Sequence, residues 1–123
     1  MNLNKALLIG YLTRDPEIRY LTDGTPVCDF GMATNYQTKT RKETEFHNLT
    51  AFGSTAERIA EFLVKGSLCY IEGRLRTESW ERDTIKHSRT KIMVERVVFS
   101  PKSAKDAEAL PERDPGEEDD IQF

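Results

Sequence analysis

The segment GSTAERIAEFLVKG, residues 53–66, carries the one convincing helical pattern in this chain of 123 residues. Ser54 followed three residues later by Glu57 is typical of a capping box at a helix start, and Gly66 is typical of a helix end. One stripe of the predicted helix carries small and apolar side chains, namely Ala56, Ile59, Ala60 and Leu63. The pattern predicts about three helical turns that cover one end of a small sheet or barrel.

Strand patterns flank this helix on both sides, because period-2 alternation and turn residues recur along the chain. In chain order we expect a strand through Leu12, a short extended return near Tyr20, a strand over residues 27–34, a hairpin arm over residues 44–53, a strand over residues 67–80, a charged loop over residues 81–88 and a last strand over residues 89–100. Five main strands with a helix between the third and fourth give the element order of the OB-fold, an all-β, five-stranded Greek-key barrel. Other small β-rich folds could share this order, so the order does not decide function.

The end of the chain differs in charge from the rest. Residues 1–100 contain 15 basic and 13 acidic side chains, a net charge of +2, whereas residues 101–123 contain 3 and 8, a net charge of −5. Residues 101–116 carry too few apolar side chains to offset the entropy lost on ordering, so we expect a disordered linker there. The chain is therefore expected to be one domain over residues 1–100, that linker, and an acidic tip, EEDDIQF, over residues 117–123.

Several classes of protein are disfavoured by what the sequence lacks. No apolar run approaches the roughly 20 residues of a membrane helix, and the first residues lack a secretory pattern, so we expect a cytoplasmic protein without membrane contact. Cys28 and Cys69 lie far apart in apolar segments, which favours reduced core thiols over a disulfide or metal site. No histidine lies in a ligand spacing and no catalytic motif is present, so we expect no catalytic residue, metal or cofactor. An enzyme that uses Cys28 or His47 is the alternative.

The hairpin arm over residues 44–53 has an unusual alternation. Phe46 and Phe52 share one face, and Asn48 and Thr50 lie between them. Polar groups at such positions do not suit a core-facing side unless they find buried partners. We therefore predict an open face on which both rings stack against bases of any identity, at about 1–3 kcal/mol per base. Packing of both rings in the core or in a subunit interface is the alternative.

A second candidate surface lies on the strand over residues 67–80. Two aromatic and two basic side chains share a parity there, unless a β-bulge intervenes: Tyr70, Arg74, Arg76 and Trp80. Two acidic side chains of the same parity, Glu72 and Glu78, argue for partial pairing. Basic side chains also gather near both predicted hairpin tips, at Lys39, Arg41, Lys42, Lys86 and Arg89, close to Tyr36 and Trp80. Each alone is more often a solvated charge, but basic loops interleaved with aromatics are typical of a single-strand groove.

Four stretches together resemble the bacterial-type single-stranded DNA-binding protein family: NKALLIGYLTRDPEIRY, TEFHNLTAFGSTAERIAEFLVKGS, YIEGRLRTESW and the ending EEDDIQF. The resemblance implies an OB-fold domain that forms a homotetramer and binds single-stranded DNA in replication, recombination and repair, at the nucleoid. It assigns base stacking to Phe46, Phe52 and Trp80, with Tyr36 as the candidate for a further stacking ring. Phosphate contacts are then expected from Lys5, Arg41, Lys42, Arg74, Arg76 and Lys86.

The acidic tip has its own expected role in this family. The resemblance implies that Ile121 and Phe123 enter an apolar pocket on a replication, recombination or repair protein, while carboxylates such as Asp119 and Asp120 approach basic residues at its rim. The tip is also hypothesised to compete with DNA for the basic groove. This chain departs from the family pattern in a phenylalanine at the first stacking position, a short linker and Gln122 in place of a proline. A primosome-type OB-fold factor that works through protein contacts is the rival among binding proteins.

Overall fold

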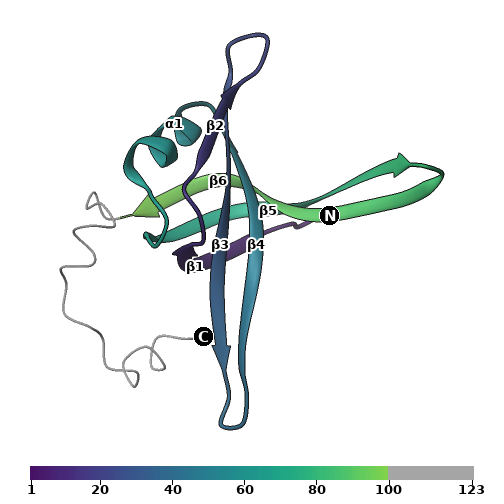
Figure 1. Ribbon diagram of the computed structural model, residues 1–123. Coiled ribbons are helices and arrows are strands. Elements are labelled where there is room, and N and C mark those ends of the chain that lie inside the picture. The colour runs from purple at the N-terminus through teal and green to yellow at the C-terminus, as the bar shows by residue number, and fades with distance from the viewer. Residues whose placement is uncertain (100–123) are drawn as a thin grey trace.

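The computed structural model describes residues 1–99, so the predicted linker and acidic tip lie outside the described residues. The described part contains six strands and one helix: β1 Ala6–Leu12, β2 Glu17–Tyr20, β3 Pro26–Gln37, β4 Lys42–Phe52, α1 Gly53–Phe62, β5 Leu68–Arg82 and β6 Ile85–Phe99. Five of the strands close a barrel, and the short β2 pairs only with β3 (Figure 1). The helix lies between the third and fourth strands of the barrel, which confirms the predicted OB-fold architecture.

The sheet runs in the order β1-β5-β6-β4-β3-β2, and two pairings decide its shape. The barrel closes where β1 meets β3, with Tyr11 opposite Ala33 and Leu12 opposite Met32. β4 and β6 form the parallel pair of the barrel, whereas the other pairs are antiparallel. One edge of β1 pairs with β5 from Ala6 to Tyr11. Since the other edge pairs with β3 only at these two positions, that edge has no strand beside it before Tyr11 in the described chain.

Helix α1 covers one end of the barrel, as its apolar stripe predicts. Ala56 and Ile59 are fully buried in the core. The predicted capping box is wrong, because the helix begins at Gly53 and its N-cap position makes no side-chain hydrogen bond. Ser54 is therefore already inside the first turn. No helix in residues 1–99 is long and apolar enough to cross a membrane.

The core of the barrel is filled by alternate residues of the long strands. Phe30, Leu49 and Ile71 are almost completely buried there. Cys28 and Cys69 are free and buried in the same core, as the apolar segments around them predict. Burial raises the pKa of Cys28 to about 11 and that of Cys69 to about 12, so both thiols stay protonated at neutral pH.

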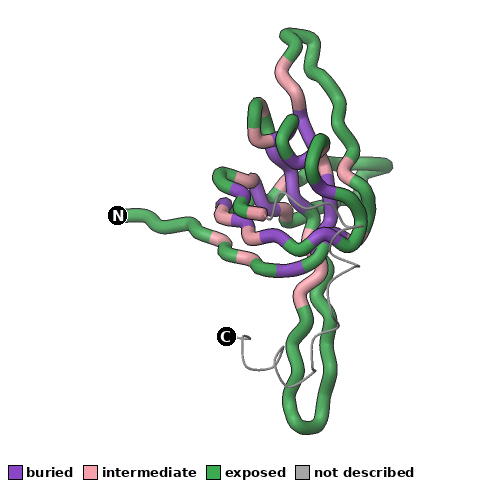
Figure 2. Tube along the Cα trace, turned by 90° about the vertical axis from the view of Figure 1, so that its left-hand side faces the viewer, coloured by how far each residue is buried: buried purple, intermediate pink, exposed green. Residues whose placement is uncertain are grey.

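Two long β-ribbons project from the barrel in different directions, one made of β3 and β4 and the other of β5 and β6 (Figure 1). They are mostly exposed, while the buried residues gather in the barrel (Figure 2). The charged loop predicted over residues 81–88 is wrong, since β5 continues to Arg82 and β6 begins at Ile85. Asp83 and Thr84 make this two-residue turn with positive φ angles of 52° and 65°, which aligns the two strands directly opposite each other.

Candidate nucleic-acid interface

Phe46 and Phe52 of β4 both reach solvent. Phe46 is 73% exposed and Phe52 is 43% exposed. On the other side of this strand, Leu49 and Ala51 are buried in the core. The two rings therefore lie on an open face of this chain, as their alternation predicts, and not in its core.

Thr50 lies between these rings but is only 2% exposed. Its hydroxyl donates a 2.8 Å hydrogen bond to Oδ1 of Asp29. The other oxygen of this carboxylate accepts a 3.1 Å bond from Nε of Arg19. Thr50 thus has the buried partner that an enclosed polar group needs, and it joins β3 to β4 instead of facing solvent. Asn48 on the same side is exposed.

The parallel pair of β4 and β6 connects the two candidate surfaces. Thr50 lies beside Met93 of β6, and Met93 lies opposite Arg74 of β5. Paired residues point to the same side of a sheet, and so do residues two apart in a strand. The register therefore puts the rings of β4 and the cations of β5 on one side. We call this surface the ring face; it comprises Phe46, Asn48, Thr50 and Phe52 of β4, His87, Arg89, Lys91 and Met93 of β6, and Arg74, Arg76, Glu78 and Trp80 of β5.

The part of the ring face on the β5–β6 ribbon combines an exposed indole with free cations. Trp80 is 45% exposed. The Lys91 ammonium lies 2.7 Å from Glu78 and lowers the pKa of that carboxyl, so these two charges largely neutralise each other. Arg74 and Arg76 form no ion pair with any residue in the described range. Their guanidinium groups remain available for an anionic ligand.

A β-bulge separates Tyr70 from this group. The β5–β6 register shifts between Glu72 and Gly73, where Glu95 has no partner on β5. Tyr70 lies on the barrel side of the bulge, and its hydroxyl donates a 2.7 Å hydrogen bond to Oε1 of Glu72, which raises the pKa of Tyr70. Trp80 lies about 33 Å farther along the strand, at the usual rise per residue. The structure therefore does not bring Tyr70 and Trp80 together.

The β3–β4 ribbon divides its predicted contact residues between two sides. Tyr36 lies opposite Glu43, three residues before Phe46. Because side chains alternate along a strand, Tyr36 and Phe46 project from opposite sides of the ribbon. Lys42 lies four residues before Phe46 and shares its side. Arg41 lies in the connecting turn, and its guanidinium is 3.4 Å from Glu43.

Two further predicted phosphate contacts have acidic neighbours. The Lys5 ammonium lies 3.6 Å from a carboxylate oxygen of Glu95. Lys86 lies opposite Glu81, one position from the pair that contains Trp80, so Lys86 projects from the other side of its ribbon. The predicted basic residues that share a side with the rings are therefore Lys42, Arg74 and Arg76.

Arg14 was not among the predicted contacts, yet its guanidinium lies over the sheet beside the ring face. Gly31 of β3 lies opposite Asn48, and a Cβ added to Gly31 would meet Nη1 of Arg14 at 2.9 Å. Arg14 therefore occupies space that this glycine leaves open, and it forms no ion pair with a described residue. The glycine inside a strand was the available signal, since such glycines often mark a close approach.

His87 was also missed, because its segment was predicted to be a loop. It lies directly opposite Trp80, and the two rings stack with centroids 5.7 Å apart and planes inclined by 19°. The register that pairs them depends on the turn at Asp83 and Thr84. Asp-Thr is not one of the dipeptides that favour a two-residue hairpin turn, so no local pattern predicted this turn.

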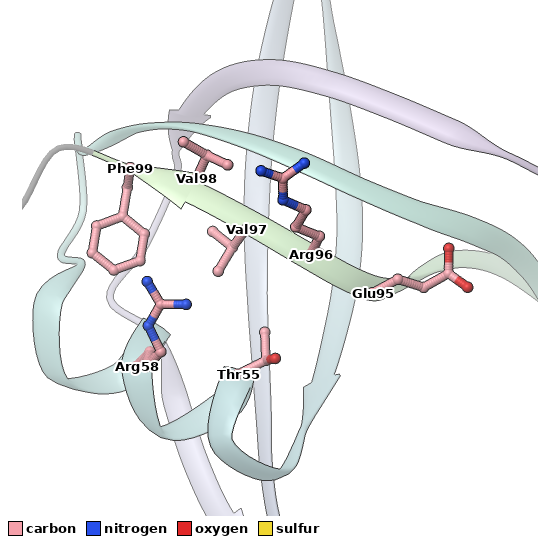
Figure 3. Close-up of a pocket in the computed structure, with 7 residues that line it drawn as sticks. All are labelled: Thr55, Arg58, Glu95, Arg96, Val97, Val98 and Phe99. Atoms are coloured by element: carbon pink, nitrogen blue, oxygen red, sulfur yellow. The ribbon is translucent and has the colours of Figure 1, made fainter.

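A separate hollow of about 370 Å³ lies between α1 and β6 (Figure 3). There the guanidinium carbon of Arg58 lies 5.3 Å from the centre of the Phe99 ring, a cation–π contact. None of the predicted DNA contacts lines this hollow. Across residues 1–99, no group of three histidine, cysteine, aspartate or glutamate side chains could hold a metal ion.

Known proteins similar to this chain share one description. The model of the single-strand binding protein family matches residues 3–100. The single-stranded DNA-binding protein of Aquifex aeolicus is 41% identical over 109 residues, which cover 83% of this chain and 74% of the relative. The protein of the same name from Neisseria meningitidis is 42% identical over 86 residues, which cover 66% of this chain and 49% of the relative.

A solved structure shows the same architecture. The structure described as the Plasmodium falciparum SSB complex with ssDNA superposes with a TM-score of 0.77 at 27% sequence identity. The superposition covers 81% of this chain and 96% of that one. The superposition thus spans nearly all of the Plasmodium chain, whereas the sequence match with the Neisseria relative spans about half of that relative's length.

Proposed function

Because this chain belongs to the single-strand binding protein family, we propose that it binds single-stranded DNA on its ring face, without sequence preference. The family match confirms the resemblance carried by the sequence motifs. The relatives from Aquifex and Neisseria are named for this activity, and the Plasmodium neighbour was solved with single-stranded DNA.

One observation supports the ring face as the site. The register of β4, β6 and β5 places Phe46, Phe52 and Trp80 on one side, with Arg74 and Arg76 between the rings of β4 and the indole. Every base has a flat π surface, so stacking of about 1–3 kcal/mol per base does not depend on base identity. The chemistry of this face therefore fits unpaired bases of any sequence.

Phosphate groups are held by cations on the same side. Arg74 and Arg76 can each form bidentate hydrogen bonds with a phosphate, and Arg14 adds a guanidinium over Gly31. Lys42 extends this side along the β3–β4 ribbon. Four other predicted contacts project from other sides of their ribbons or have acidic neighbours: Lys5, Tyr36, Arg41 and Lys86. They reach the DNA where it wraps around the ribbons.

Titration with oligo(dT) tests this proposal through two signals. Trp80 is the only tryptophan, so its emission should be quenched as DNA stacks on it. Anisotropy of a labelled oligonucleotide measures binding independently, and the logarithm of affinity should fall by about 0.7 per phosphate contact for each log unit of salt. Absence of binding in anisotropy would overturn the proposal. Binding with unchanged emission at saturation would remove Trp80 from the site.

We also propose that the protein assembles as a homotetramer. Leu7, Ile9 and Tyr11 form an exposed row on the outer side of β1, and their neighbours in the sheet extend this apolar surface, which we call the apolar stripe: Leu7, Ile9, Tyr11, Leu68 and Val98. The edge of β1 before Tyr11 is also open. A free strand edge beside exposed aliphatic side chains is suited to another protein chain. The number of subunits rests on the family resemblance.

The biological role proposed for the chain is protection of single-stranded DNA in replication, recombination and repair, at the nucleoid in the cytoplasm. It acts by binding and not by catalysis. The acidic tip recruits partner proteins through Asp119, Asp120, Ile121 and Phe123. Burial of one phenylalanine contributes about 1.5–3 kcal/mol, so a single tip binds weakly. Several tips on one oligomer raise the effective concentration.

Deletion of residues 117–123 tests the role of the tip. The shortened protein should keep its DNA binding and lose its capture of repair and replication proteins. If the tip also competes with DNA for cations of the ring face, the deletion should raise DNA affinity at low salt. Unchanged affinity at low salt would contradict that competition.

A further inference from the structure

The stacked rings of Trp80 and His87 are an arrangement that base stacking by Trp80 alone does not require. The two residues face each other across β5 and β6, with ring centroids 5.7 Å apart and planes inclined by only 19°. Both residues are exposed, so burial in a core does not hold the rings together. The stack itself is what orders them.

The imidazole covers one face of the indole and leaves the other uncovered. His87 belongs to β6, so its ring lies on the β6 side of Trp80. Within residues 1–99, β5 has no strand on its other edge near Trp80, because its pairing with β1 ends at Gly73 and the two hydrogen bonds of the Asn4 side chain are with the backbone of Leu75. The free face of the indole is therefore turned to the open edge of β5, from which an unpaired base can approach.

Cations outnumber free carboxylates around this stack. Within residues 1–99 only β5 and β6 contribute side chains here, since β4 pairs with β6 only at Ile92 and Met93, at least five residues from His87. Glu78 lies on the same side but is ion-paired with Lys91 at 2.7 Å. The other charged side chains near the stack are Arg82 and Arg89, which share its side, Glu81 and Lys86, which project from the other side of the ribbon, and Asp83 in the turn.

Resting on the DNA binding proposed above, we propose that His87 is a positioning residue of the ring face. Its imidazole holds the Trp80 indole ready for a base. An indole without this support has to be ordered when DNA binds, which weakens binding by about threefold to tenfold.

Two variants and one control test the flat ring. His87→Phe keeps a flat ring, and His87→Ala removes it. His47→Gln is the matched control, because the only other histidine lies on the opposite side of β4 from Phe46, 2.9 Å from the Thr34 hydroxyl. At pH 8, His87→Phe should bind oligo(dT) as the wild type does, whereas His87→Ala should bind about threefold to tenfold more weakly.

Fluorescence of the free protein tests the stack without DNA. The anisotropy of Trp80 emission should fall in His87→Ala, because the indole loses its stacking partner, and should keep the wild-type value in His87→Phe. Equal affinity of wild type and His87→Ala for oligo(dT), or equal anisotropy of Trp80 emission in the two proteins, would overturn the proposal. If the wild type bound no DNA, the proposed function would fail together with this inference; if it bound DNA and the His87 variants matched it, only this inference would fail.

Discussion

Two exposed apolar surfaces lie on the outer side of one barrel, and β5 and β6 contribute to both. The ring face carries aromatic rings and, between them, guanidinium groups that form no ion pair within residues 1–99, those of Arg74 and Arg76. The apolar stripe carries aliphatic side chains such as Ile9 next to an open strand edge. On β5 the boundary is the β-bulge between Glu72 and Gly73. Exposed apolar area therefore does not identify a partner by itself; free cations indicate a polyanion, and a free backbone edge indicates another protein chain.

The largest expected effect is on the rings of β4. Replacing both Phe46 and Phe52 by alanine should remove about 2–6 kcal/mol of DNA binding free energy, at about 1–3 kcal/mol per stacked base. Anisotropy with oligo(dT) at fixed salt measures the loss. Tyr20→Ala is the matched control, because Tyr20 is an exposed aromatic on β2, away from both surfaces. A loss no larger than that of the control would remove these rings from the site.

The next effect concerns the apolar stripe. Ile9→Arg places a charge without a partner in the proposed subunit contact, so the oligomer should dissociate. Light scattering should show a lower mass, while a short oligo(dT) should still quench Trp80. Ile85→Arg changes an exposed aliphatic residue on the β5–β6 ribbon and should keep the mass of the wild type. An unchanged mass of Ile9→Arg would show that the stripe is not a subunit interface.

A smaller effect is expected when single cations of the ring face are removed. Arg74→Ala and Arg76→Ala should each reduce the slope of log affinity against log salt by about 0.7, because each loses one phosphate contact. Arg58→Ala removes the same charge from the hollow between α1 and β6 and should leave the slope unchanged. An equal reduction of the slope in all three variants would mean that only the net charge of the protein decides the salt dependence of binding.

The smallest effect is expected at Gly31. Gly31→Ala puts a methyl group 2.5 Å from the Thr13 hydroxyl oxygen and 2.9 Å from Nη1 of Arg14, so both side chains have to move and the phosphate contact of Arg14 should weaken in part. Arg14→Ala should reduce the salt slope by about 0.7, and Gly31→Ala by less. Combining the two changes should add nothing to Arg14→Ala alone. Additive losses in this cycle would show that Gly31 does not act through Arg14.

Local patterns in the sequence were enough to predict the fold and to predict which side of β4 is exposed. Two local patterns depend only on neighbouring residues: the alternation around Phe46 and Phe52 and the helical spacing of the apolar residues in α1. Both appear in the structure as predicted. The capping box failed because the helix begins at Gly53, one residue before Ser54, and its N-cap position makes no side-chain hydrogen bond. Such a shift of one or two residues is typical at helix ends.

The assembly of the site depended on register, which local patterns do not contain. The contact of Thr50 with Met93 joins strands that are far apart in the sequence, and it is what places Phe46 and Arg74 on one side. The two ribbons also show this limit. Lys86 and Tyr36 have side chains suited to DNA, but the strand register puts them on the sides of their ribbons that face away from the rings, where each lies opposite an acidic residue.

The most direct test of the ring face is ultraviolet cross-linking of the protein to oligo(dT), with the cross-linked residues identified by mass spectrometry. Phe46, Phe52 and Trp80 should all form cross-links, because thymine rings lie against them. Tyr11 is equally an exposed aromatic, but it belongs to the apolar stripe and should form none. Cross-links at Tyr11 with none at the three ring-face residues would contradict the account.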